Sequence, residues 1–203
     1  VDEFVNSAMG LNVQVGVKTE YMALKQAAKT HAEVRLMPKG KPKYYSVGVV
    51  DTPDQLSRTT ETHTLVVDNT SGTTESNTTT TETERTNELK LSAEMARRFG
   101  PLTLHGGIIE SSAGLGLNYQ PLKQFTISTE LFDFGQDDVP YLRGYGTIYP
   151  VFDPDSANLL NWLYLTGGVD NALHNEERDY FFGIGMRLTD NDLRTVLPFV
   201  PSP

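Results

Sequence analysis

Apolar and polar residues alternate with a period of two through most of this chain, and this period restricts the secondary structure that the chain can form. In LNVQVGVKTEYMAL, Leu11, Val13, Val15 and Val17 occupy every second position. The same spacing recurs in NELKLSAEMARRF, LTLHGGII, FTISTELF and YFFGIGMRL. A period of two is typical of a strand with one apolar face. Roughly ten to twelve such runs, separated by turn signals such as KGKP and FGP, predict an all-β antiparallel meander closing into a barrel.

Glycine recurs inside these runs, as Gly106, Gly107, Gly114 and Gly116 do within the stretch ARRFGPLTLHGGIIESSAGLGLNYQPL. Glycine weakens a strand unless the position needs a bend, a bulge or a close backbone approach. A sheet that coils strongly enough to close on itself uses glycine at such points. The glycines therefore favour a small closed barrel.

The runs divide the chain into segments. Residues 1–10 read as the end of a preceding helix closed by Gly10, which indicates a piece of a longer protein. Residues 11–188 form the predicted barrel, interrupted at 58–86 by a Thr-rich mobile loop or ribbon. Residues 189–203 predict a short amphipathic C-terminal helix or tail, with a helix stop at Pro198.

Alternation alone does not say which face of the sheet points inward. In a soluble barrel the apolar face lies inside, and in a transmembrane barrel it meets lipid. Aromatic residues near the run ends suit the interfacial girdles of a membrane barrel, although edge packing gives the same pattern. These residues are Tyr21, Tyr44, Tyr45, Phe99, Tyr119, Phe125, Phe134, Tyr141, Tyr149, Trp162 and Tyr180. If the interior is polar, the charged residues that line it are Lys18, Glu20, Lys90, Glu94, Glu130, Arg143 and Arg187.

Composition removes several classes of protein. The 203 residues include no cysteine, so neither disulfides nor thiolate metal sites form. The net charge of −9 and the lack of a basic stripe argue against a nucleic-acid partner. No apolar run is long enough for a membrane-spanning helix.

No catalytic constellation is recognisable. The histidines, His31, His63, His105 and His174, lie far apart on different runs. The acidic turn DFGQDD does not match the ligand spacing of an EF-hand. We therefore predict a protein that is not an enzyme, with no catalytic, cofactor-binding or metal-binding residues.

Two long stretches carry a family resemblance. SAEMARRFGPLTLHGGIIESSAGLGLNYQPLKQFTISTELFDFGQDDVPYLRGYGTIYP and LYLTGGVDNALHNEERDYFFGIGMRLTDNDLRTVL resemble the C-terminal β-barrel-like region of bacterial MCE (mammalian cell entry) proteins. The resemblance implies a non-enzymatic role in lipid transport across the bacterial envelope, with phospholipid or another lipid as cargo. It further implies a place in the outer membrane or periplasm, a missing N-terminal MCE domain, an inner-membrane ABC transporter as partner, and a homohexamer in the full-length form.

Two other functions fit the same pattern. One is a plain outer-membrane barrel that acts as a pore or an anchor. The other is a soluble lipocalin-like carrier of apolar ligands, with the apolar face inside.

Overall fold

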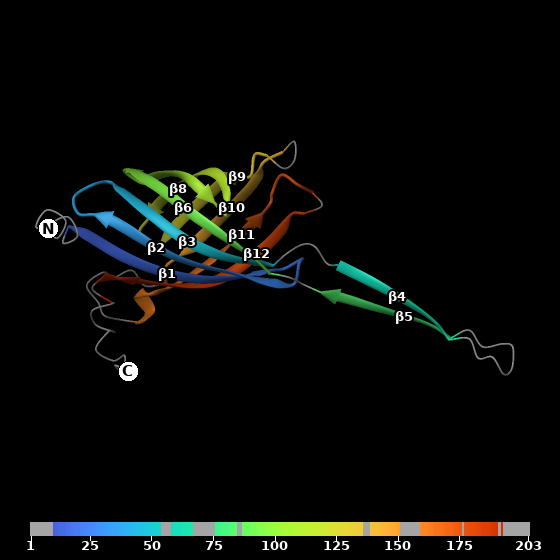
Figure 1. Cartoon of the computed structure of the whole chain (residues 1–203). Helices are drawn as coiled ribbons and strands as arrows, with labels where there is room; N and C mark the ends of the chain where they lie inside the picture. Colours follow the sequence, from blue (N-terminus) through green and yellow to red (C-terminus); the bar gives the residue numbers. More distant parts are fainter. Residues whose placement is uncertain are drawn as a thin grey trace, which may run out of the picture. The chain divides into compact units, whose positions relative to one another are not determined.

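A computed structural model describes residues 10–53, 58–66, 76–84, 87–135, 139–150, 159–175, 177–190 and 192. The chain divides into two compact units, one formed by residues 1–52 and 89–203 and the other by residues 53–88. The first unit is built from strands joined in sequence, with one short 3-10 helix, η1 (Leu159–Asn161) (Figure 1). Its strands are β1 (Leu11–Met22), β2 (Ala27–Pro38), β3 (Lys43–Pro53), β6 (Asn87–Phe99), β7 (Leu102–Ile109), β8 (Ser112–Leu122), β9 (Phe125–Phe132), β10 (Tyr141–Ile148), β11 (Leu163–Asp170) and β12 (Asp179–Thr189).

These strands form a closed barrel in the order β1-β12-β11-β10-β9-β8-β7-β6-β3-β2. Neighbours in this order pair antiparallel, and β1 closes the barrel against β12 with Val17 opposite Met186. The predicted all-β antiparallel meander of roughly ten to twelve strands is confirmed, with ten strands in the barrel. Because all of its strands are paired, the barrel has no open edge.

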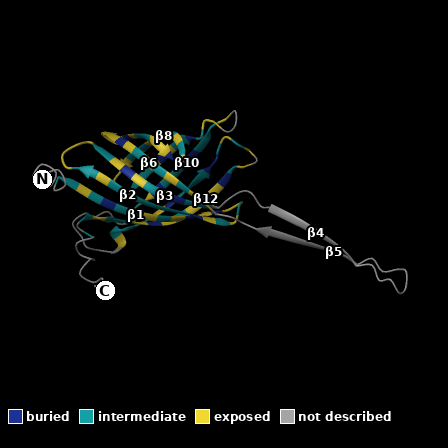
Figure 2. Cartoon of the chain, in the orientation of Figure 1, coloured by how far each residue is buried: buried dark blue, intermediate teal, exposed yellow. Residues whose placement is uncertain are grey.

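The apolar face of the barrel points outward. On β3, Val47 and Val49 are exposed, while Ser46 and Val50, which flank them in sequence, are buried. Figure 2 shows the same alternation of exposed and more buried residues along the barrel strands. Every barrel strand contributes at least one exposed large apolar side chain, among them Val17, Val34, Val47, Leu91, Leu104, Leu115, Ile127, Ile148, Leu165 and Ile184. This arrangement is the reverse of a soluble barrel, whose apolar side chains fill the interior.

Charged residues at outward strand positions are few in the described part of the chain. By alternation they are Lys43, Asp51 and Arg97. Lys43 is the first residue of β3, and Asp51 and Arg97 lie two residues before the ends of β3 and β6. The middle of the barrel wall is therefore apolar on the outside, with charge confined to the strand ends.

The second unit is a two-stranded antiparallel ribbon of β4 (Arg58–Val66) and β5 (Ser76–Glu84). Its register places Thr62 opposite Thr80 and His63 opposite Thr79. The Thr-rich stretch predicted as a mobile loop or ribbon thus contains a paired ribbon. Residues 67–75 between its strands lie outside the described residues.

Two predicted segments are left untested. Residues 1–9, predicted as the end of a helix, lie outside the described residues. So does nearly all of the predicted C-terminal helix at 189–203, of which residues 189, 190 and 192 are described.

Candidate functional site in the barrel interior

The barrel interior is polar, and its two ends differ. The end that carries the β1–β2 turn and the β7–β8 turn is filled by a cluster of buried ions. The end that carries the first residues of β1 contains a cavity. The interior as a whole is the candidate site, because charged side chains converge in it from most of the barrel strands.

Arg143 is the centre of the ion cluster. Its side chain, on β10, is 1% exposed and contacts three carboxylates from three separate parts of the chain. It donates a hydrogen bond to Glu20 on β1. Its Nη1 lies 3.4 Å from Glu110 Oε1, and its Nε lies 3.6 Å from Asp170 Oδ1 on β11. The guanidinium group also lies over the ring of Phe181, 4.6 Å from its centroid.

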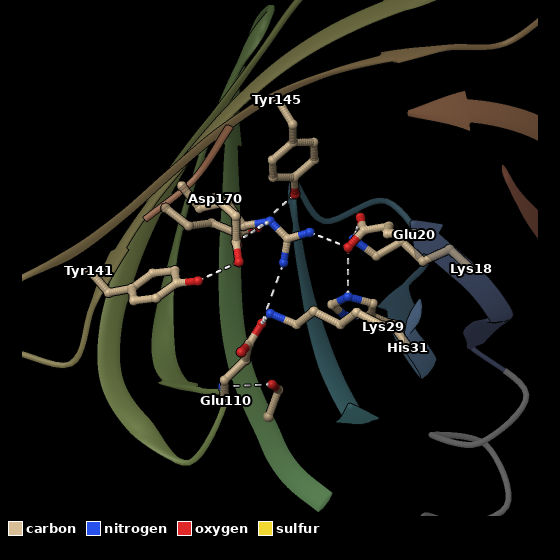
Figure 3. Close-up of polar contacts among 11 residues, drawn as sticks. Lys18, Glu20, Lys29, His31, Glu110, Tyr141, Tyr145 and Asp170 are labelled. Atoms are coloured by element: carbon tan, nitrogen blue, oxygen red, sulfur yellow. Dashed lines mark hydrogen bonds and ion pairs between the residues drawn. The ribbon is translucent and has the colours of Figure 1, made fainter. Parts of the chain in front are cut away.

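Four further side chains pair with these carboxylates, and one of them is His31, whose Nε2 lies 2.9 Å from Glu20 Oε2. Lys29 Nζ lies 2.5 Å from Glu110 Oε1, and Lys18 Nζ lies 2.9 Å from Glu20 Oε1. Tyr141 donates its hydroxyl hydrogen to Asp170. Figure 3 shows these side chains converging from several strands on one point of the lumen. Burying a charge is tolerated when it is paired and hydrogen-bonded. Every charge of this cluster is paired, although Arg143 Nε and Asp170 Oδ1, 3.6 Å apart, have no hydrogen-bond partner in the described part of the chain.

Glu110 reaches the cluster from a tight turn. It joins β7 to β8 with Ser111, and both residues adopt left-handed backbone conformations, with φ of 46° and 66°. Hairpin turns of this kind normally use Asn or Gly, because other side chains are disfavoured at positive φ. The turn is held against β6: the Glu110 backbone N–H donates to Ser92 Oγ, and the Leu91 N–H donates to Ser111 Oγ, both at 3.0 Å.

The electrostatic environment of Glu110 favours its ionised form. Burial alone would raise the pKa of this carboxyl group. The adjacent Lys29 ammonium and Arg143 guanidinium groups outweigh burial, so the pKa lies below its ordinary value. Glu110 is thus an anion that is 6% exposed and neutralised by two cations.

The cluster closes this end of the lumen. Glu20, Lys29, Arg143 and Asp170 are each no more than 2% exposed. Buried apolar side chains, including Met22 and Phe132, pack at the same end. Asp179 caps the neighbouring β1–β2 turn by accepting hydrogen bonds from the backbone N–H groups of Leu24 and Lys25, at 2.8 and 2.9 Å. Interior side chains fill this half of the barrel, as expected for a barrel of this size.

The remainder of the lumen contains a cavity of about 220 Å³, and Lys18, His31, Glu110 and Arg143 of the ion cluster form part of its wall. The carboxylates that line it all have partners. Glu110 pairs with Lys29 and Arg143, Glu33 lies 2.8 Å from Arg35, Glu94 lies 2.5 Å from His105, and Glu130 accepts a hydrogen bond from Tyr145 at 2.6 Å. The polar groups that also line it include Tyr44, Arg98, Asn118, Gln120, Tyr149, Tyr164 and Arg187.

Two glycines create space for large side chains on the cavity wall. A Cβ atom at Gly116 would lie 2.3 Å from the His105 ring, and one at Gly185 would lie 2.2 Å from the Tyr164 ring. The two rings therefore lie against glycine backbone on the neighbouring strands. Glycine in this barrel serves close approach between neighbours, in addition to the curvature predicted from the sequence.

The structure brings together most of the predicted interior residues. Lys18, Glu20 and Arg143 belong to the ion cluster. Glu94, Glu130 and Arg187 line the cavity, as Lys18 and Arg143 also do. Lys90 shares the inward-facing parity of Ser92 and Glu94 on β6. Sequence reasoning missed Lys29, His31, Glu110 and Asp170. Lys29 and His31 could have been found, because Lys29, His31, Glu33 and Arg35 occupy alternate positions along β2 and therefore share one face of the strand.

The aromatic residues predicted for the girdles divide between two faces. Tyr21, Tyr45, Phe99, Tyr119 and Tyr180 are exposed on the outside. The prediction is wrong for Tyr44, Tyr141 and Tyr149, which point inward and contact interior polar groups or line the cavity. The alternation itself separates Tyr44 from Tyr45, because successive strand residues point to opposite faces.

Two other kinds of feature are absent from the described residues. No group of three or more His, Asp or Glu side chains there is arranged to hold a metal ion. No helix in the described segments has the length and apolar character needed to cross a membrane.

Comparison with known proteins assigns the chain to a family and corrects one prediction. A lipocalin-like domain family matches residues 13–195, nearly the whole chain. An uncharacterized protein of Aquifex aeolicus (strain VF5) is 29% identical over 107 residues, which are 50% of this chain and 31% of that protein. The chain thus covers about a third of this relative's length. The predicted MCE resemblance is wrong, since the matching family is a different one and no MCE family matches. The chain belongs to the family of lipocalin-like domains.

Proposed function

We propose that this lipocalin-like domain is an outer-membrane-type barrel, embedded in lipid through its apolar wall, that acts as an anchor and not as an open pore. The observation that carries the proposal is the reversed polarity of the barrel. Large apolar side chains are exposed on every barrel strand, whereas Glu20, Lys29 and Arg143 are buried inside. A transmembrane barrel has this distribution, with an apolar band outside and a polar interior.

The extent of the apolar wall supports a bilayer as its partner. Soluble monomers rarely expose a contiguous apolar patch of more than a few hundred Å². Here the exposed apolar residues follow one another around a closed barrel, and outward charges in the described strands occur only near strand ends. Phe99 and Tyr119 lie toward one end of the wall and Tyr21 and Tyr180 toward the other. These positions suit the two interfaces of a membrane.

The filled half of the lumen supports an anchor over a pore. A conducting barrel needs a continuous aqueous path. The ion cluster around Arg143 is almost completely buried, so it leaves no such path through the end that carries the β7–β8 turn. The proposal includes a location of this barrel in the outer membrane of a bacterial envelope.

A soluble lipocalin-like carrier is the second candidate, and the family assignment favours it. A carrier of apolar ligands requires an apolar interior. The cavity of this chain is lined by Arg35, Glu94, His105, Glu130 and other polar groups, which suit a polar ligand better. The polar cavity therefore argues against a carrier of apolar ligands, and the bilayer proposal comes first.

The decisive experiment is a partition test of the chain between buffer, detergent and lipid. Residues 1–203 are refolded in buffer, in detergent micelles and in phosphatidylcholine vesicles. The bilayer proposal predicts a monodisperse species in detergent, co-flotation with vesicles and aggregation in buffer alone. A folded, monodisperse protein in buffer that does not float with vesicles refutes it and favours the carrier.

Val47→Arg then tests the orientation of the wall. Val47 is 62% exposed in the middle of β3. An arginine on the lipid face near the bilayer midplane lowers the free energy of unfolding by about 2–4 kcal/mol. The same substitution at an exposed position of a soluble protein changes that free energy by about 0.5 kcal/mol or less. Unfolding of the vesicle-bound variant by urea measures the difference.

A further inference from the structure

We infer that the interior cavity is a binding site for a small organic anion, whose carboxylate or phosphate group is held by Arg98 and Arg187, with Arg35 beside them. The inference concerns the part of the cavity that lies away from the ion cluster, toward the end of the barrel that carries the first residues of β1. It does not depend on the bilayer proposal, because the cavity is the same whether lipid or water surrounds the wall.

The cavity has unpaired positive charge. Its carboxylates are engaged by Arg35, His105 and the Tyr145 hydroxyl, as described above. Arg98 and Arg187 line the same cavity and form no ion pair with a carboxylate in the described part of the chain. A guanidinium group presents several fixed donors that match the oxygens of a carboxylate or phosphate. An anion is therefore the ligand that completes the charge balance of this lining.

Aromatic rings hold two of the three arginines in position. The Arg187 guanidinium lies 4.6 Å from the centroid of the Tyr149 ring and donates to the Tyr149 hydroxyl at 3.2 Å. Arg35 lies 5.2 Å from the centroid of the Tyr44 ring. Such stacking fixes the orientation of a guanidinium while leaving donors free. Tyr149 in turn packs on Tyr164, with 5.7 Å between ring centroids.

The register of the barrel brings two of these arginines to either side of one strand. On β1, Gln14 pairs with Arg35 of β2, and Gly16 pairs with Arg187 of β12. Gly16 carries no side chain, and the Glu33 side chain, which pairs with Arg35, lies over it: a Cβ atom at Gly16 would be 3.4 Å from Glu33 Cγ. Arg98 lies at the same end of the barrel, because its backbone N–H donates to the carbonyl of Pro42 in the β2–β3 turn.

Buried polar atoms without partners support a missing ligand. Arg35 Nε, His105 Nε2 and Thr166 Oγ1 are buried and lack a hydrogen-bond partner in the described part of the chain, and all three residues line this cavity. Unsatisfied buried polar groups are few in folded proteins, and a bound molecule is one way to satisfy them. Arg143 Nε and Asp170 Oδ1 in the ion cluster are also buried without a hydrogen-bond partner, but these two atoms face each other at 3.6 Å, as opposite charges, whereas the three atoms above line the cavity.

The size and lining of the cavity limit the ligand. About 220 Å³ holds a molecule the size of a substituted benzene ring and excludes a lipid with full acyl chains. The tyrosine rings provide flat surfaces for the body of such a ligand. We therefore choose benzoate and phenyl phosphate as probes, inorganic phosphate as the anion without a ring, and benzyl alcohol as the neutral analogue.

The test is isothermal titration of each probe into the folded full chain. We expect saturable binding of benzoate or phenyl phosphate and none of benzyl alcohol. Arg187→Gln and Arg98→Gln should each weaken binding about tenfold or more, the loss expected when a hydrogen bond to a charged group is removed. Arg97→Gln is the matched control, because Arg97 adjoins Arg98 in sequence but lies on the outer face, over the Phe99 ring.

Several results would overturn the inference. They are binding of benzyl alcohol as tight as that of benzoate, no saturable binding of any anion, or an equal loss in Arg97→Gln. Binding of inorganic phosphate alone would overturn the organic ligand class. Arg98 is exposed at a strand end, so Arg98→Gln keeps the test valid if Arg187→Gln does not fold. Circular dichroism confirms the fold of each variant.

Discussion

Replacing Arg143 by methionine is the sharpest perturbation of the buried ion cluster. Methionine keeps much of the length of the side chain and removes the charge. The variant leaves the carboxylates of Glu20, Glu110 and Asp170 without their shared partner. Lys18 still pairs with Glu20 and Lys29 with Glu110, but Asp170 retains only the Tyr141 hydroxyl.

The size of the expected destabilisation by Arg143→Met follows from the burial of the ion pairs. Removing one partner of a buried ion pair costs about 3–5 kcal/mol, because the other charge stays buried and uncompensated. Arg143 is 1% exposed and contacts three carboxylates, so we expect at least that loss in the free energy of unfolding. Arg97→Met on the outer face should change stability by about 0.5 kcal/mol or less.

Urea titration followed by the fluorescence of Trp162, the sole tryptophan of the chain, measures both variants. A double-mutant cycle with Glu20→Gln separates pairing from packing. If the pair is coupled, Glu20→Gln/Arg143→Met loses less than the sum of the single losses, by about 0.5–3 kcal/mol. A loss of less than about 1 kcal/mol for Arg143→Met, or strict additivity, would refute the view that the cluster holds this end of the barrel together.

Three other predictions test separate parts of the interior. Gly185→Ala should lose about 1–3 kcal/mol by crowding the Tyr164 ring, while Gly144→Ala, with no atom within 4 Å of its added Cβ, stays near wild type in the same urea titration. Asp179→Ala should lose about 1–3 kcal/mol in thermal unfolding, because the N–H groups of Leu24 and Lys25 lose their acceptor, and Asp179→Asn should recover part of it. The lowered pKa of Glu110 makes its contribution fully present above its unfolded pKa of about 4.3 and lost as the pH falls through the folded value. Urea midpoints between pH 6 and 3 should therefore fall more steeply for wild type than for Glu110→Gln, and parallel curves would contradict the assignment.

The strand pattern made the barrel predictable, but not the direction of its faces. Alternation fixes which residues share a face, and both orientations have the same period. Val47 and Ser46 illustrate the limit, because their alternation is the same whether valine meets lipid or a core. Which face points inward depends on how the side chains of all the strands pack together, and the alternation within one strand does not show that.

The ion cluster was only half predictable for a related reason. Glu20 and Arg143 were recognised as members of a polar face, but they are 123 residues apart, and their pairing depends on closure of the barrel. Glu110 was hidden because it lies in a turn without the glycine that usually marks one. Its place in the cluster follows from the Ser92 and Ser111 hydrogen bonds, which tie the turn to β6.

We assign different roles to the two halves of the interior: the ion cluster stabilises the barrel, and the cavity binds a ligand. Around Arg143 and Lys29, each buried charge has an opposite charge within the barrel, so the charges of this half balance one another. In the cavity half, Arg98 and Arg187 have no carboxylate in the described part of the chain, and Arg35 Nε has no hydrogen-bond partner there. A barrel wall that faces lipid offers its interior no hydrogen bonds, so polar groups inside must be satisfied by each other, by water or by a ligand. If the cavity serves only to fill space, neutral replacements of Arg98 and Arg187 should leave stability unchanged with and without added benzoate. If it binds an anion, benzoate should raise the unfolding midpoint of wild type alone, because a ligand that binds only the folded state stabilises it.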